Sequence, residues 1–242
     1  MRVIFVALFL GIYAIFTIPM LLVEFILGKT DPHKKAAVAQ YCVQKAFKFI
    51  LFISGVKMTV KGKENILYDR PALYAYNHRG YFDALCCYAT APVPTAFIAK
   101  KEVQHAHMIS WWMKCMNCLF LDRKDSKSGL KTIKNGIKLL KNGTSVYIAP
   151  EGTRTSGITL QEFSDGGFRL AEKAKCPIVP IAINNTDEVF ENHFPWVRSA
   201  HVIIEYCEPI YLDNMDRSEI KNISSKVHDI IAERLKENLK EI

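Results

Sequence analysis

Short apolar runs alternate with longer stretches of helical period along most of the chain. Runs typical of buried strands begin near Ala72, Ala96, Cys118, Ser145, Ile178 and His201. Between them, apolar residues from Leu130 to Leu140 recur at helical spacing, and Gly143 supplies a stop before the next run. A last amphipathic helix is expected over Ile220 to Leu235. This alternation predicts an α/β fold, in which helices flank a mixed sheet.

The N-terminal stretch has a different pattern. Val3 to Val23 contains no charged residue and is about as long as a helix that crosses a bilayer. Pro19 is expected to kink this helix and Glu24 to end it. The run is too long for a typical signal-peptide core, and no small-residue cleavage site follows it, so a retained membrane segment is favoured.

A second helical stretch, 36–55, mixes aromatic and aliphatic side chains with Lys45 and Lys48. This pattern suits a helix at a membrane interface, whose lysines reach lipid phosphates, or a helix that caps the domain. Spanning and monotopic insertion both fit, and the cluster Lys29, Lys34 and Lys35 favours a cytoplasmic catalytic domain. We therefore expect membrane-anchoring helices over 1–57 and one catalytic domain over 58–242.

Composition and net charge limit the classes of partner that this chain is expected to bind. Half of the 242 residues are apolar, enough for one sizeable core and an appendage. The formal net charge is +8, but acidic residues are interspersed with the cations, and no nucleic-acid-binding motif is present. Membrane lipid or another anionic ligand accounts for this charge better than nucleic acid does.

The cysteines predict neither a disulfide framework nor a metal site. Seven cysteines are an odd count in a chain expected to face the cytosol. One C-x2-C, Cys115 and Cys118, has no second pair, so no zinc is predicted. Cys86 and Cys87 are expected on a buried helix face, which argues against a thiol nucleophile.

Two polar blocks directly follow strand-like runs and carry the candidate chemistry. The first is Asn77-His78-Arg79-Gly80-Tyr81-Phe82-Asp83. If a strand ends at Tyr76 and a helix begins near Tyr81, Asp83 reaches back from the first helical turn to His78. One imidazole nitrogen would then bond to Asp83 and leave the other as a general base. A solvated surface pair has the same spacing.

The second block is Pro150-Glu151-Gly152-Thr153-Arg154. Pro150 ends the preceding strand because it has no N–H to donate, and Gly152 permits backbone angles closed to other residues. Glu151 and Arg154 are thereby presented at the carboxyl end of the strand, as an anion clamp or as an ordinary loop with a surface ion pair.

Two further cations, Lys100 and Arg123, also follow predicted strands. Open α/β sheets bind ligands outside the carboxyl ends of their strands, so these cations are expected near both polar blocks. A solvated charge at a strand end fits each of them equally well.

Taken together, four segments resemble a known family. N-H-R-G-Y-F-D, L-F-L-D-R, P-E-G-T-R-T and V-P-I-A-I, in this order between Ala72 and Ile183, are similar to the motifs of the glycerolipid acyltransferases. The likeness is greatest to the 1-acyl-glycerol-3-phosphate (lysophosphatidate) acyltransferases. It implies transfer of an acyl group from acyl-CoA or acyl carrier protein to the hydroxyl of a lysophospholipid, giving phosphatidate without a metal or bound cofactor.

The resemblance also implies roles for single residues. His78 would take the proton of the acceptor hydroxyl and Asp83 would orient His78. The backbone N–H groups of the turn at Gly80 or at Gly152 would stabilise the oxyanion. The acceptor's phosphate and glycerol end would be bound by Glu151, Gly152, Thr153 and Arg154, with added charge from Lys100 and Arg123.

Departures from the family pattern leave the acceptor open. The family often has serine at the position of Gly80, glycine at Asn117, lysine at Ser164 and a second proline at Ala182. Glycerol 3-phosphate or another lysophospholipid is therefore an alternative acceptor. A thioesterase, in which His78 activates water, and a non-catalytic lipid-binding protein are alternatives of a different class.

Overall fold

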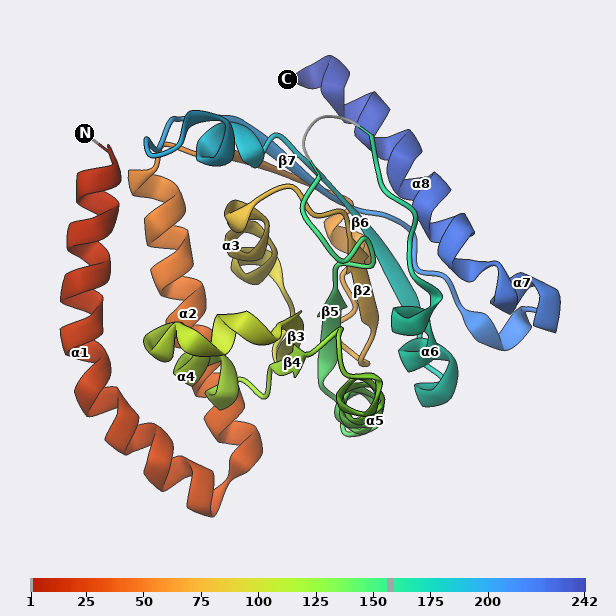
Figure 1. The fold of residues 1–242 in the computed structure, drawn as a ribbon, viewed down its shortest axis with the longest axis horizontal. Coiled ribbons are helices and arrows are strands. Elements are labelled where there is room, and N and C mark those ends of the chain that lie inside the picture. The colour runs from red at the N-terminus through yellow and green to blue at the C-terminus, as the bar shows by residue number, and fades with distance from the viewer. Residues whose placement is uncertain (1, 156–158) are drawn as a thin grey trace.

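A seven-stranded sheet organises the computed structural model, which describes residues 2–155 and 159–242 (Figure 1). The strands are β1 (Lys57–Lys61), β2 (Leu73–Tyr76), β3 (Thr95–Lys100), β4 (Leu119–Leu121), β5 (Ser145–Ile148), β6 (Ile178–Asn184) and β7 (His201–Tyr206). Their order is β1-β7-β6-β2-β5-β3-β4. Only the β6–β7 pair is antiparallel within this described sheet, so the predicted mixed sheet is confirmed. The strand β1 was not predicted.

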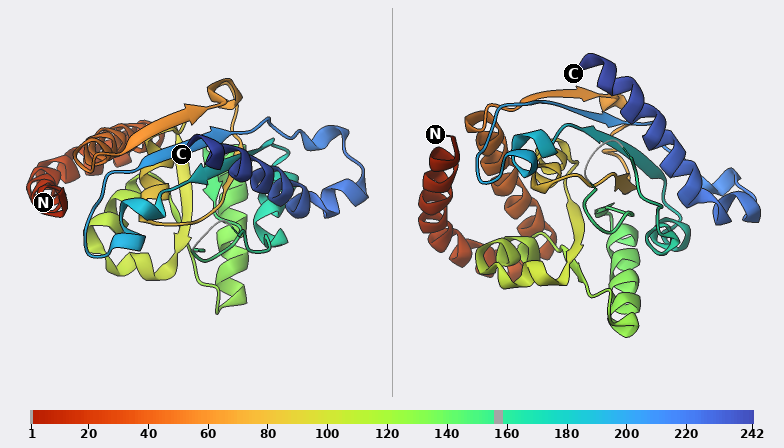
Figure 2. Two further views of the ribbon diagram at one scale, coloured as in Figure 1. Left: turned by 90° about the horizontal axis from the view of Figure 1, so that it is seen from above. Right: turned by 45° about the horizontal axis from the view of Figure 1, so that its top comes forward.

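Helices cover both faces of the sheet (Figures 1 and 2). They are α1 (Arg2–Thr30), α2 (Pro32–Ile53), α3 (Tyr81–Thr90), α4 (His107–Cys115), α5 (Ser126–Lys141), α6 (Asp165–Ala174), α7 (Arg217–Lys221) and α8 (Ile223–Asn238). The predicted C-terminal helix is thus divided at Asn222, whose φ of −99° and ψ of 12° depart from helical values, and an Asp216–Glu219 capping box begins the short helix before it.

The alternation of side chains along the strands separates two cores. On β2, Tyr74 and Tyr76 face α2, α3 and α4, whereas Leu73 and Ala75 face α5, α6 and α8. All seven residues of β6 are buried, as expected for the V-P-I-A-I run. The central strands are therefore covered on both sides, which leaves their carboxyl ends as the accessible edge.

The first helix is longer than the sequence predicts. α1 continues through Pro19 and past Glu24 to Thr30, so the expectation that Glu24 ends it is wrong. Glu24 is buried, and Lys35 and Lys114 line the same hollow between α1 and α4. The acidic residue is therefore accommodated inside the helix by packing in this hollow.

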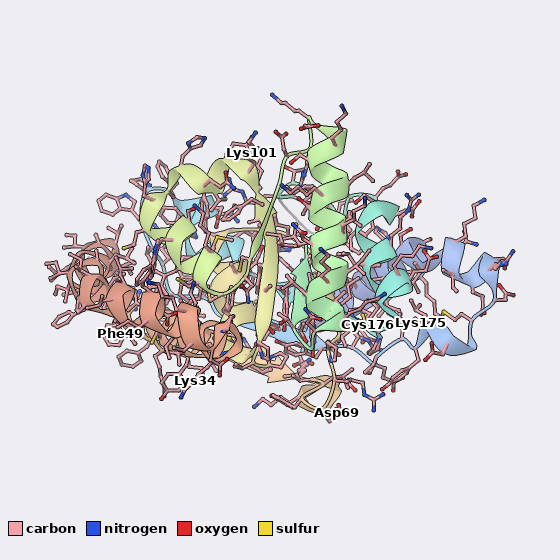
Figure 3. All side chains as sticks on the ribbon, turned by 90° about the horizontal axis from the view of Figure 1, so that it is seen from below. Lys34, Phe49, Asp69, Lys101, Lys175 and Cys176 are labelled. Atoms are coloured by element: carbon pink, nitrogen blue, oxygen red, sulfur yellow. The ribbon has the colours of Figure 1, made fainter. Side chains whose placement is uncertain are left out.

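Two helices, α1 and the Lys34–Ile53 part of α2, are long and apolar enough to cross a membrane. α1 is the outermost element, on the side of α2 that faces away from the sheet (Figures 1 and 2). Phe49 of α2 also lies on this outer side (Figure 3). The large exposed apolar residues of α1 are Ile4, Phe5, Leu8, Leu10, Ile12, Ile15, Phe16, Ile18, Leu22, Val23, Phe25 and Ile26.

Candidate active site

The four neighbouring strands β2, β5, β3 and β4 are parallel, so their carboxyl ends meet at one edge of the sheet. His78 follows β2 and Glu151 follows β5. Lys100 is the last residue of β3, and Arg123 follows β4. The sequence prediction that these four positions share one edge agrees with this topology.

At the first polar block, a histidine contacts a buried carboxylate. His78 Nδ1 lies 2.7 Å from Asp83 Oδ2, between the turn after β2 and the first turn of α3. Asp83 is fully buried, and the same oxygen accepts the backbone N–H groups of Arg79, at 2.7 Å, and Gly80, at 2.9 Å. These bonds hold Nδ1 of the ring towards Asp83, while 28 % of the His78 side chain stays exposed.

Two buried residues that were given no role from the sequence complete this turn. Thr186, after β6, donates its hydroxyl to Asp83 Oδ1. Asn77 donates from Nδ2 to the Ile183 carbonyl at 2.9 Å and accepts the Ile183 N–H at 2.7 Å. The end of β6 therefore fixes both the carboxylate and the start of the histidine turn. The polar residues that directly follow the buried strand β6 were the sequence signal that could have indicated this role.

The second polar block is bonded to the first. Glu151 Oε1 accepts the backbone N–H of His78 at 2.7 Å, and the His78 carbonyl accepts the N–H of Thr155 at 2.9 Å. Glu151 Oε2 accepts the Thr155 hydroxyl and, at 3.1 Å, the N–H of Gln161. Glu151 is 9 % exposed. From this buried position, Glu151 links the turn after β2 to the turn after β5 by hydrogen bonds.

Gly152 has φ of +78°, the left-handed conformation that the sequence analysis expected of it. Arg123 lies directly against this residue, because an added Cβ would be 2.6 Å from Arg123 Nη1. The structure thus brings Arg123 to the turn that carries Thr153 and Arg154. Lys100 is 62 % exposed and 3.8 Å from Glu102. Within residues 2–155 and 159–242, no hydrogen bond or ion pair joins Lys100 to either polar block.

Arg154 points back towards the start of α3. Its guanidinium lies 4.3 Å from the centre of the Tyr81 ring, and Nη1 is 3.4 Å from Glu191 Oε1. The Arg154 side chain is 42 % exposed. A cation therefore stands beside the histidine turn and is open to an anionic ligand. Glu191 was not predicted, since its segment between β6 and β7 has no motif.

The glycine N–H groups, the cysteines and the possible metal ligands complete the description of the site. The N–H groups of Gly80 and Gly152 bond to Asp83 and to the Ala149 carbonyl, so they are engaged within the chain. All seven cysteines are free thiols, and burial raises the pKa of the Cys87 thiol well above its usual value. In the described part of the chain, no three histidine, cysteine or carboxylate side chains are grouped to hold a metal.

Comparison with known proteins shows which family this chain resembles. The family model described as "Acyltransferase" matches residues 57–184. A 1-acyl-sn-glycerol-3-phosphate acyltransferase of Saccharomyces cerevisiae is 27 % identical over 84 % of this chain and 68 % of its own length. Proteins of the same name from Cocos nucifera and Borreliella burgdorferi are each 26 % identical over 80 % of this chain, and over 62 % and 77 % of their own lengths.

The fold also matches a solved structure. The crystal structure of the 1-acyl-sn-glycerophosphate (LPA) acyltransferase PlsC from Thermotoga maritima superimposes with a TM-score of 0.75, covering 98 % of both chains at 22 % identity. This likeness extends over the N-terminal helices and the sheet, so the whole architecture, and not the motif region alone, is shared.

Proposed function

This chain belongs to the acyltransferase family, and we propose on that premise that it transfers a fatty acyl group from a thioester to the free hydroxyl of 1-acyl-glycerol-3-phosphate. The product is phosphatidate, and the donor is acyl-CoA or acyl carrier protein. The observation that carries the proposal is the 2.7 Å contact between His78 and buried Asp83, beside the cationic Arg154 turn.

In the proposed reaction His78 is the general base. With Nδ1–H donated to Asp83, Nε2 accepts the proton of the acceptor hydroxyl as the oxygen attacks the thioester carbonyl carbon. The tetrahedral oxyanion then collapses, the carbon–sulfur bond breaks, and the imidazolium returns its proton to the leaving thiolate. No covalent acyl-enzyme is formed.

Glu151 is assigned a positioning role in this proposal. Both of its oxygens already accept hydrogen bonds, from His78, Thr155 and Gln161. A carboxylate engaged in this way, and nearly buried, supports the histidine turn better than it binds an anionic acceptor. Arg154, with Thr153, is assigned to the acceptor's phosphate and glycerol end, and Lys100 and Arg123 to added positive charge around it.

Arg154→Ala is expected to raise KM for lysophosphatidate by roughly 10- to 100-fold, since a hydrogen bond to a charged group is worth about 1.5–3 kcal/mol. Initial rates over a range of acceptor concentrations measure this. Arg169→Ala is the matched control, because it removes an exposed arginine from α6. Equal KM values for the two variants would show that Arg154 does not bind the acceptor's phosphate.

Gly152→Ala is expected to lower the free energy of unfolding by about 1–2 kcal/mol, because alanine is strained at φ of +78°. The added Cβ also displaces Arg123, so KM for lysophosphatidate should rise. Gly143→Ala is the control: Gly143 has φ of +84° but open space around its Cβ position. Urea unfolding and acceptor kinetics of both variants separate strain from displacement. An unchanged KM in Gly152→Ala would show that the Arg123 contact does not affect acceptor binding.

The membrane assignment belongs to the same proposal. We assign 1–57 to membrane anchoring and 58–242 to catalysis, with the exposed apolar side chains of α1 in contact with lipid. α2 contributes Ala39 and Val43 to the main core, so it fixes the anchor against the catalytic domain. The lysines at the α1–α2 turn favour a cytoplasmic catalytic domain.

The decisive experiment is release of free thiol from an acyl-CoA by the purified full chain in detergent, with and without lysophosphatidate. Release that needs the acceptor and is matched by formation of phosphatidate supports the proposal. Release without acceptor would instead indicate a thioesterase. If release is absent with acyl-CoA, acyl carrier protein is tested as donor, and glycerol 3-phosphate and other lysophospholipids as acceptors. Absence of turnover with all of them would overturn the proposal.

A further inference from the structure

Glu191, in the segment between β6 and β7, reaches both turns of the site. Its Oε1 accepts the backbone N–H of Tyr81, at the start of α3, at 2.7 Å. The same oxygen lies 3.4 Å from Arg154 Nη1. Only 19 % of the Glu191 side chain is exposed. The carboxylate of Glu191 therefore already contacts Arg154, the residue that the proposed function assigns to the acceptor's phosphate.

The second carboxylate oxygen is poorly accommodated. Glu191 Oε2 is buried and has no hydrogen-bond partner among the described residues. It lies against Gly80, where an added Cβ would be 2.4 Å away. Gly80 has φ of −159°, which any residue adopts, so backbone strain does not require glycine at this position. A serine side chain would instead compete with Glu191 for space. A buried, unpaired carboxylate oxygen is costly, and this favours its release.

We propose that Glu191 controls acceptor affinity by occupying the position that the acceptor's phosphate takes at Arg154. This inference rests on the proposed function. Carboxylates and phosphates both accept hydrogen bonds from guanidinium and backbone N–H groups, so the two donors that face Glu191 now, Arg154 Nη1 and the Tyr81 N–H, would bond to only one of them at a time. Binding of the acceptor then requires that Glu191 withdraws.

A purely structural role for Glu191 makes the opposite prediction. If its carboxylate only holds Arg154 and the start of α3 in place, weakening the contact should impair binding of the acceptor. If it competes with the phosphate, weakening the contact should improve binding. Glu191→Gln separates the two, because the amide oxygen can still accept the Tyr81 N–H while the negative charge is lost.

For Glu191→Gln in the full chain in detergent, KM for lysophosphatidate is expected to fall roughly three- to tenfold, as is the Kd from equilibrium binding. Glu188→Gln is the matched control. Glu188 lies in the same segment but contacts Asn192, at 2.7 Å, and His193, at 2.9 Å. A KM that is unchanged or higher in Glu191→Gln would overturn the inference, as would an equal fall in Glu188→Gln.

Gly80→Ser gives an independent test, since its side chain takes the space of Glu191 Oε2. It should lower the Kd for lysophosphatidate as Glu191→Gln does, and the double variant should show no further gain. An additive gain would mean that the two changes act separately and would contradict displacement of Glu191.

The dependence on pH supplies a third readout. Burial raises the pKa of Glu191, the nearby Asp83 adds to this, and Arg154 opposes it. The backbone N–H of Tyr81, which Glu191 accepts at the start of α3, opposes the rise as well. As the pH falls through this raised pKa, the neutral side chain releases Arg154. The ratio of the wild-type Kd to the Glu191→Gln Kd should therefore fall towards one, and a ratio independent of pH would contradict competition by the charged form.

Failure of this inference can be distinguished from failure of the proposed function. If neither protein releases thiol in an acceptor-dependent way, the acyltransferase proposal fails, but equilibrium binding of lysophosphatidate still reports on Glu191. Tighter binding to Glu191→Gln would then support competition at Arg154, and equal or weaker binding would overturn it.

Discussion

Replacement of His78 by alanine is expected to lower kcat for acyl transfer by about 10²- to 10⁴-fold, the usual contribution of a positioned general base. The acceptor hydroxyl is a poor nucleophile until its proton is removed, and the ring at the carboxyl end of β2 is the base in the proposed reaction. Because the phosphate is assigned to Arg154, binding of lysophosphatidate should be retained. Acceptor-dependent thiol release and equilibrium binding of lysophosphatidate measure the two effects separately.

His105→Ala is the matched control for this experiment. His105 is an exposed histidine after β3, so its removal changes the same side chain outside the site. Turnover near the wild-type level in His78→Ala would exclude His78 as the base. If the wild-type protein releases thiol without acceptor and His78→Ala does not, the protein is a thioesterase. If the wild-type protein binds lysophosphatidate but shows no turnover, it is a lipid-binding protein.

The sequence predicted the parts of the site that depend on local signals. A strand that ends in Tyr76 and a helix that starts at Tyr81 leave a short turn for His78, and the structure has these bounds. Pro150 and Gly152 likewise mark the end of β5 and the turn after it. Since parallel neighbouring strands place their carboxyl ends together, position along the chain was enough to predict that the candidate residues follow strands at one edge of the sheet.

The contacts that hold the site together were outside the reach of local patterns. The bond from His78 to Glu151 joins residues 73 positions apart, and that from Thr186 to Asp83 spans 103. Glu191 meets Tyr81 across 110 positions. Each contact depends on the order of strands in the sheet, which places β6 next to β2 and which the hydrophobic period does not encode.

Burial also changed the meaning of single residues. Glu24 was predicted to end α1 because a charge normally limits an apolar helix, but α1 continues to Thr30 and Glu24 is buried in the hollow between α1 and α4. β1 was missed because its short sequence, K-M-T-V-K, has lysines at both ends. Its strand conformation is set by parallel pairing with β7.

Asp83→Asn is expected to lower kcat by about 10²-fold or more, close to the loss in His78→Ala. Asp83 Oδ2 receives three donors, from His78 Nδ1 and the N–H groups of Arg79 and Gly80. Oδ1 receives the hydroxyl of Thr186. An amide has one oxygen and no negative charge. With its NH2 turned to the Thr186 hydroxyl, which can also accept, the oxygen still bonds to His78 but no longer stabilises the imidazolium that forms as the ring takes the proton. With its NH2 turned to His78, the ring is held in the wrong tautomer, so either arrangement lowers kcat.

The same substitution should lower the free energy of unfolding by about 1–3 kcal/mol, since the buried bonds to this side chain lose their charged acceptor. Thr186→Val is the informative comparison, because it removes one donor but keeps the carboxylate and its bond to His78. It should lose stability of the same order and far less kcat. Urea unfolding, together with kcat measured where each variant is fully folded, separates the two effects. If Asp83→Asn and Thr186→Val lose kcat equally, Asp83 maintains the fold of this turn but does not orient His78 for catalysis.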